Sequence, residues 1–148
     1  MRRGCLDARS VYAPLLLGLV GCGGDREAVI YPVWGTLTVG GRPAANAMVA
    51  FHRLDRPGSR AALPVASTGP DGSYRLTTRA AGDGAPAGRY AVTVVWPDDS
   101  RPRDECEHIA EHDRFEGRYA DPAGSPWRVT VGPGGNVVPL RADPRPPA

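Results

Sequence analysis

The most strand-like stretch of the chain is RYAVTVVW, residues 89–96, in which β-branched and aromatic side chains dominate. Side chains alternate between the two faces of a strand, so Tyr90, Val92 and Val94 are expected in a core and Thr93 on the outer face. Because few of these positions are polar, the stretch is expected to run through the centre of a sheet.

Other segments with the same period of two lie on both sides of this stretch, and Gly- or Pro-containing turns separate them. Their number and spacing predict an all-β chain that folds as a β-sandwich of about seven strands. The further strands are expected at residues 33–39, 47–54, 64–68, 73–78, 127–131 and 136–140. Tyr74, Leu76, Val129 and Val131 are expected to join the core, and Arg75, Arg128 and Thr130 to face outward.

The composition agrees with one β domain. The chain has 148 residues, of which 19 are Gly and 16 are Pro, which disfavours a helical bundle. All 18 basic residues are Arg, and against 16 acidic residues they leave a formal charge of only +2. Nucleic-acid binders usually carry a clustered basic excess, so a nucleic-acid partner is not expected.

The first residues have the pattern of a secretory signal. Arg2 and Arg3 precede a mostly apolar run at residues 11–21, which is too short for a membrane-spanning helix. The run ends in LVGC, residues 19–22, which resembles the bacterial lipobox. The resemblance implies that the signal peptide 1–21 is removed and that the thiol of Cys22 receives a lipid.

Lipidation at Cys22 predicts a protein of the cell envelope, anchored on the periplasmic or surface side of a membrane. Residues 22–30 are small and charged and are expected to form a short tether. Cys5 leaves with the signal peptide and Cys22 carries lipid, so only Cys106 remains as a thiol in the mature chain. A disulfide within one mature chain is therefore excluded.

Several motifs of the mature chain, taken in order, resemble one family. They are residues 31–38 with 41–43, 47–52, 68–74, 82–90, and 118–121 with 125–127. Together they are similar to the carboxypeptidase regulatory-like domain of bacterial lipoproteins, a transthyretin-like (prealbumin-like) Greek-key β-sandwich. The resemblance implies a noncatalytic domain at 31–141, without a cofactor and with no catalytic residue carried over. The proline-rich tail 142–148 is expected to be disordered.

One cluster offers an alternative to a noncatalytic role. His108 and His112, four residues apart, would share a helix face, and Cys106 would be a third zinc donor. This pattern would suit a small metal-dependent hydrolase or a metal carrier. The cluster lacks the His-Glu-x-x-His order that places a base beside the metal, and a solvated polar insertion is the favoured interpretation. A zinc ion that the fold requires is not expected.

Two further features bear on ligands. The glycine-rich loop 82–88 precedes a strand and holds Asp83, so it is interpreted as a connection and not as an anion cradle. Trp34 and Trp127 would form a platform for a sugar or peptide if exposed, whereas packing in the core or an interface is the alternative. The favoured function is a lipid-anchored envelope module for binding or structural protein interaction. Its expected partner is an envelope protein or a glycan, for which pairing at exposed strand edges is one mode.

Overall fold

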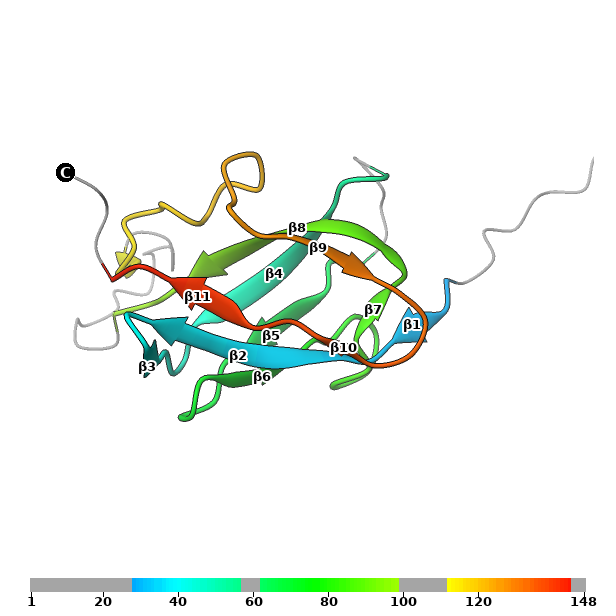
Figure 1. Cartoon of the computed structure of the whole chain (residues 1–148), viewed down its shortest axis with the longest axis horizontal. Coiled ribbons are helices and arrows are strands. Elements are labelled where there is room, and N and C mark those ends of the chain that lie inside the picture. Colours follow the sequence, from blue (N-terminus) through cyan, green and yellow to red (C-terminus); the bar gives the residue numbers. More distant parts are fainter. Residues whose placement is uncertain (1–27, 57–61, 99–111, 145–148) are drawn as a thin grey trace, which may run out of the picture.

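The computed structural model of the chain describes residues 28–56, 62–98 and 112–144. These residues form an all-β sandwich, as the sequence predicts (Figure 1). Several strands have only two residues, so the described strands outnumber the seven expected. The strands are β1 (Ile30–Tyr31), β2 (Val33–Val39), β3 (Arg42–Pro43), β4 (Met48–Arg53), β5 (Val65–Ser67), β6 (Ser73–Arg75), β7 (Ala85–Pro86), β8 (Gly88–Val95), β9 (Arg128–Val131), β10 (Asn136–Val137) and β11 (Leu140–Ala142).

One sheet is antiparallel and has the order β5-β4-β8-β9. Tyr90 of β8 pairs with Arg53 of β4 on one side and with Val129 of β9 on the other. The stretch that is most strand-like in sequence therefore lies inside a sheet, which confirms the expectation.

The second sheet is built around β2. Strands β10 and β11 run parallel to β2 along one side, with Asn136 opposite Val33 and Leu140 opposite Leu37. Strands β6 and β3 pair with β2 in antiparallel orientation. The short strands β1 and β7 pair with each other beside this sheet.

The core fills the space between the two sheets. The side chains of Phe51, Leu37, Leu140 and Tyr90 are fully buried there, and the rings of Phe51 and Tyr90 lie 5.8 Å apart. The side chains expected to point inward are confirmed as core residues: Tyr74, Leu76, Tyr90, Val92, Val94 and Val131 are buried, and Val129 is partly buried against them.

Thr93 was expected on the outer face of β8, and there it is buried instead of exposed. Thr93 is only 6% exposed, and its hydroxyl lies 2.9 Å from Nε2 of His52, which is itself half-buried. Burial lowers the pKa of His52. Thr93 points away from the core, but His52 of the neighbouring strand β4 lies against it and shields it.

The two sides of β8 predict different losses of stability. We expect Val92→Ala to lower the free energy of unfolding by about 2 to 3 kcal/mol, because it leaves a cavity in the core. Thr93→Ala removes one hydrogen bond on the outer face and is expected to cost about 1 kcal/mol. Urea denaturation followed by circular dichroism measures both values. A larger cost for Thr93→Ala than for Val92→Ala would contradict the assigned faces.

The ordered domain extends beyond both expected boundaries. Ala142 was expected in a disordered tail, yet it lies in β11, is 6% exposed and accepts a hydrogen bond of 3.1 Å from the N–H of Gly40. Ile30 was expected in the tether, yet it pairs with Pro86. Both corrections have one cause, since pairing with distant strands orders residues that have no strand pattern of their own. Residues 1–27 and 145–148 lie outside the described residues.

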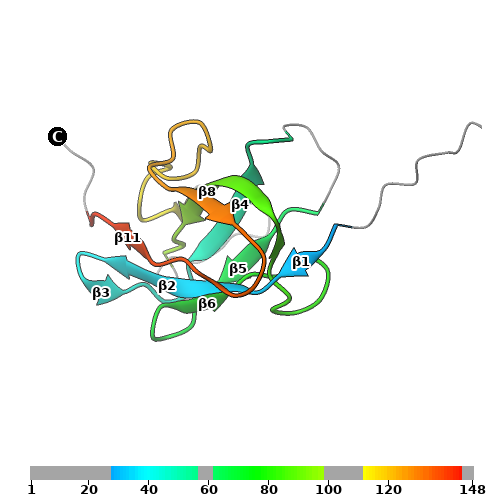
Figure 2. The same ribbon diagram turned by 45° about the vertical axis from the view of Figure 1, so that its right-hand side comes forward.

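The sandwich has two distinct ends. At the basal end lie β1, the start of β8, the end of β4 and the turn 132–135 between β9 and β10 (Figures 1 and 2). At the distal end lie the turn between β2 and β3 and the end of β11. Strand β2 connects the two ends over roughly 20 Å.

Candidate functional site at the distal end

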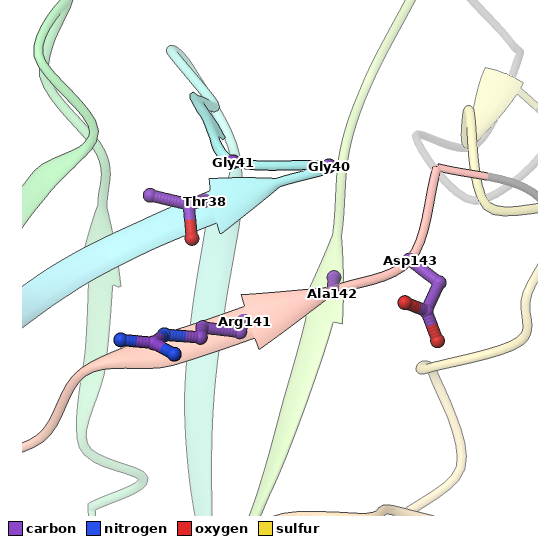
Figure 3. Close-up of a pocket in the computed structure, with 6 residues that line it drawn as sticks. All are labelled: Thr38, Gly40, Gly41, Arg141, Ala142 and Asp143. Atoms are coloured by element: carbon purple, nitrogen blue, oxygen red, sulfur yellow. The ribbon is translucent and has the colours of Figure 1, made fainter.

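The distal end carries a surface pocket of about 480 Å³. Three elements contribute to it: the end of β2, the turn between β2 and β3, and the end of β11 (Figure 3). The lining residues are Thr38, Gly40, Gly41, Arg141, Ala142 and Asp143.

Strand register and turn geometry place these residues together. Thr38 pairs with Arg141, and both point to the outer face of the β2 sheet, away from the buried Leu37 and Leu140. Gly40 and Gly41 have φ values of 56° and 80°, which is the left-handed geometry of a two-residue hairpin turn. A Cβ atom on Gly40 would also lie only 3.2 Å from the side chain of Pro144.

The pocket offers groups that bind polar ligands. Figure 3 shows the guanidinium of Arg141 at one end of the pocket and the carboxylate of Asp143 at the other. Together with the Thr38 hydroxyl, they can donate to and accept from a peptide or a glycan. The charged and hydroxyl groups of the lining give this pocket the composition of a polar binding site.

An aromatic cluster lies next to the distal end and contacts the chain that lines the pocket. The ring of Phe115 lies 5.6 Å from that of Trp96 and 4.9 Å from that of Tyr119, whose ring is in turn 4.8 Å from Trp127. The hydroxyl of Tyr119 accepts a hydrogen bond of 3.3 Å from the N–H of Asp143. The cluster therefore holds the pocket-lining chain at Asp143 in place.

Asp113 connects this cluster to β8. Asp113 is 8% exposed, and its carboxylate accepts hydrogen bonds from the N–H groups of Trp96 at 2.8 Å, Phe115 at 3.1 Å and Gly117 at 3.0 Å. The sequence predicts a polar insertion here, and it does not predict that Asp113 and the aromatic residues after it are buried. The available signal was the presence of Phe115 and Tyr119 in this stretch, because such large aromatic side chains are often buried.

The two tryptophans considered as a platform pack in different places. Trp34 lies on the outer face of β2, with the Arg75 guanidinium 6.0 Å from its ring. A Cβ on Gly135 would be 2.6 Å from the Trp34 ring, so this glycine allows the close approach. Trp127 is partly buried against Tyr119 in the aromatic cluster. Trp34 and Trp127 do not form one shared surface.

The residues considered for zinc are only partly described. Cys106 and His108 lie outside the described residues, as does Cys22. His112 is half-buried, and its carbonyl accepts a hydrogen bond of 2.8 Å from the N–H of Asp98. Among residues 28–56, 62–98 and 112–144, no three His, Cys, Asp or Glu side chains are grouped so as to hold a metal ion.

Asp83 of the glycine-rich loop 82–88 binds the backbone of the turn that precedes the loop. Asp83 accepts hydrogen bonds from the N–H groups of Thr78 at 2.7 Å, Arg79 at 3.0 Å and Ala80 at 3.0 Å. Burial opposes the charge of this carboxylate, but the three donors together lower its pKa. The side chain of Asp83 therefore orders the turn at residues 78–83.

Asp83 predicts a loss of stability in acid. Because its folded pKa is lowered, its contribution is complete above the unfolded pKa of about 3.9 and is lost as the pH falls through the folded value. We expect Asp83→Asn to lower the free energy of unfolding by about 1 kcal/mol at pH 7. The difference from the wild type should shrink at pH 3 in urea denaturation. A difference that grows in acid would contradict the assignment.

Comparisons with known proteins return nothing: no protein-family model, curated protein or solved structure matches the chain. The similarity to the carboxypeptidase regulatory-like domain therefore stays a prediction from the sequence. In the part of the chain that the structure describes, no helix has the length and apolarity needed to cross a bilayer.

Proposed function

We propose that the protein is a noncatalytic, lipid-anchored module of the cell envelope that binds a protein or glycan partner at its distal end. The observation that carries the proposal is that the N-terminal strand and the polar pocket lie at opposite ends of the sandwich. The first described strand, β1, begins at Ile30 at the basal end, while the polar pocket lies at the other end of β2.

The distance to the membrane follows from the tether. Only residues 23–29 separate Cys22 from β1, and fully extended they span at most about 25 Å. A lipid on Cys22 would hold the basal end near the bilayer. The pocket would then point away from the membrane, at roughly 20 Å further out, which is the length of β2.

The strand edges offer less to a partner than the pocket does. The N–H of Val92 donates to the carbonyl of Trp127. Backbone groups of successive residues along β9 point alternately toward β8 and away from it, so within β9 only those of Arg128 and Thr130 face the open edge. Pro126 precedes this short edge. Along β10 and β11, the exposed Pro139 lies at an outward-facing position and has no N–H to donate. Prolines at such positions discourage strand addition, which favours the pocket.

The anchor is tested by replacing Cys22. We expect Cys22→Ala to move the protein from the membrane fraction to the soluble fraction, since several acyl chains hold a protein firmly and none would remain. Residues 1–21 of this variant are exchanged for a signal that is cleaved without lipidation, so that the apolar run 11–21 does not itself retain the protein. Cell fractionation and the intact mass of the N-terminal peptide are measured.

Cys106→Ala with the native signal is the matched control and should stay in the membrane fraction. A wild type that carries no lipid mass would contradict the anchor. Near-stoichiometric zinc in the purified mature protein, with loss of β-sheet circular dichroism in chelator, would contradict the noncatalytic proposal in favour of the Cys106, His108 and His112 cluster.

The distal pocket is tested by photo-crosslinking in cells. A photoreactive residue at Thr38 should give a discrete adduct with an envelope protein or glycan. The same residue at Arg128, which is exposed on the β9 edge, is the control and should not. Adducts from Arg128 alone would contradict the pocket as the binding surface.

A further inference from the structure

The basal end gathers exposed aliphatic side chains. Val29 is 65% exposed, Leu54 is 39% exposed and Leu63 is 45% exposed. Exposed aliphatic side chains that gather at one end of a domain suit a contact surface.

Hydrogen bonds and strand pairing bring these three residues to the same end from separate segments. Leu54 follows β4, and its N–H donates to the carbonyl of Arg89 at 2.8 Å. Leu63 lies on the returning chain, where the next residue, Pro64, accepts from the N–H of Phe51 at 2.9 Å. Val29 directly precedes β1, which pairs with β7 beside the start of β8, as Figure 1 shows.

The same end is cationic. Arg56 and Arg89 are exposed there, and Nη1 of Arg79 donates to the carbonyl of Ala28 at 3.2 Å. The carboxylates nearby are engaged: Asp55 is bound by Arg53 at 2.7 Å, and Asp83 accepts from backbone N–H groups. Arginines beside exposed aliphatic side chains suit a surface of anionic lipid headgroups, where cations meet phosphates and apolar groups enter the interface.

We propose that the basal end rests on an anionic membrane surface, with Val29, Leu54 and Leu63 in the interface and Arg56 and Arg89 against lipid phosphates. The inference rests on the proposed anchor at Cys22, because residues 23–29 keep this end within about 25 Å of the lipid. That tether raises the local concentration of the bilayer at this face far above that of any free protein. The membrane is therefore the favoured occupant.

The experiment uses the lipidated mature protein in vesicles made of equal parts phosphatidylcholine and phosphatidylglycerol. An environment-sensitive fluorophore is attached to Leu54→Cys in a Cys106→Ser chain. Met48→Cys is the matched control, since Met48 is 42% exposed and lies at the opposite end of the same strand, β4. Circular dichroism checks the β-sheet of both variants.

We expect a blue-shifted emission at position 54 and about threefold weaker quenching by an aqueous quencher than at position 48, because the interface excludes the quencher. Replacing both Arg56 and Arg89 by Ala, or using vesicles of phosphatidylcholine alone, should reduce this protection. Equal protection without anionic lipid would overturn the role of the arginines and with it the proposal.

Equal quenching at both positions, with the protein retained on the vesicles, would overturn the inference and leave the anchor intact. Loss of the protein from the vesicles would instead overturn the anchor, and the inference that rests on it. Protection that arises only after envelope proteins are added would assign this face to a protein partner and would also overturn the inference.

Discussion

Gly35→Ala is expected to lower the free energy of unfolding by about 3 to 5 kcal/mol, a cost at the upper end for a single methyl group. Gly35 lies in the middle of β2, and a Cβ atom built there would overlap the carbonyl oxygen of Val138 on the neighbouring strand segment. A backbone atom cannot yield as the end of a flexible side chain can. The substitution must therefore push β2 away from the chain that pairs with it.

A buried tyrosine also requires the close approach of Gly35 to the Val138 carbonyl. Tyr74 pairs with Gly35 across β6 and β2, is 3% exposed, and donates a hydrogen bond of 2.6 Å from its hydroxyl to the carbonyl of Val138. Burial raises the pKa of this hydroxyl. The Tyr74 hydroxyl would lie 3.0 Å from the new Cβ, so Gly35→Ala disturbs both the strand pairing and this bond.

Gly132→Ala is the matched control for this prediction. A Cβ at Gly132 would meet no heavy atom within 4 Å, and this residue lies in a turn. Its expected change is within about 0.5 kcal/mol. Urea denaturation monitored by far-ultraviolet circular dichroism measures both variants, and equal midpoints would show that β2 and residues 136–142 are not packed as described.

The sequence predicts those strands whose apolar and polar residues alternate, because this alternation can be seen without knowing which strand pairs with them. In β8, β2, β4 and β9, alternation of apolar and polar side chains is a local property, because one face of each strand meets the core. Two-residue strands such as β1 and β7 have no period to detect. Their formation depends on pairing between Ile30 and Pro86, which are distant in sequence.

The parallel pairing of the C-terminal chain shows the same limit. Residues 136–140 are predicted as a strand, but nothing local indicates that Ala142 continues it beside Val39 of β2. The proline-rich composition after Ala142 predicts disorder, whereas the partner strand imposes order as far as Ala142. The composition of a segment contains no information about the partner strand with which the segment forms its hydrogen bonds.

The candidate site was less predictable than the fold. The distal pocket depends on the register that sets Thr38 beside Arg141, and neither residue has a distinctive motif. The sequence instead suggests a site at Cys106, His108 and His112, because the spacing of metal ligands can be seen in a sequence. A pocket formed by strand ends has no such spacing.

Asp113 stands next to His112 and has a role that a metal-ligand pattern does not suggest. Its buried carboxylate accepts three backbone N–H groups, two from the turn at Phe115 and Gly117 and one from Trp96 at the end of β8. This turn carries the aromatic cluster whose Tyr119 hydroxyl binds the N–H of Asp143. The Asp113 carboxylate therefore connects this turn to the end of β8.

Asp113→Ala is expected to lower the free energy of unfolding by about 3 kcal/mol, because three donors lose their acceptor and buried donors without acceptors are costly. Asp113→Asn keeps one acceptor oxygen and should fall between Asp113→Ala and the wild type. Asp121→Ala is the control. Asp121 is exposed, and among the described residues its carboxylate accepts only the N–H of Ala123, at 2.9 Å. We therefore expect Asp121→Ala to lower the free energy of unfolding by less than about 1 kcal/mol. Urea denaturation gives the three values, and near-ultraviolet circular dichroism reports the packing of Trp96 and Trp127. Equal costs for Asp113→Ala and Asp121→Ala would show that the Asp113 carboxylate does not order this turn.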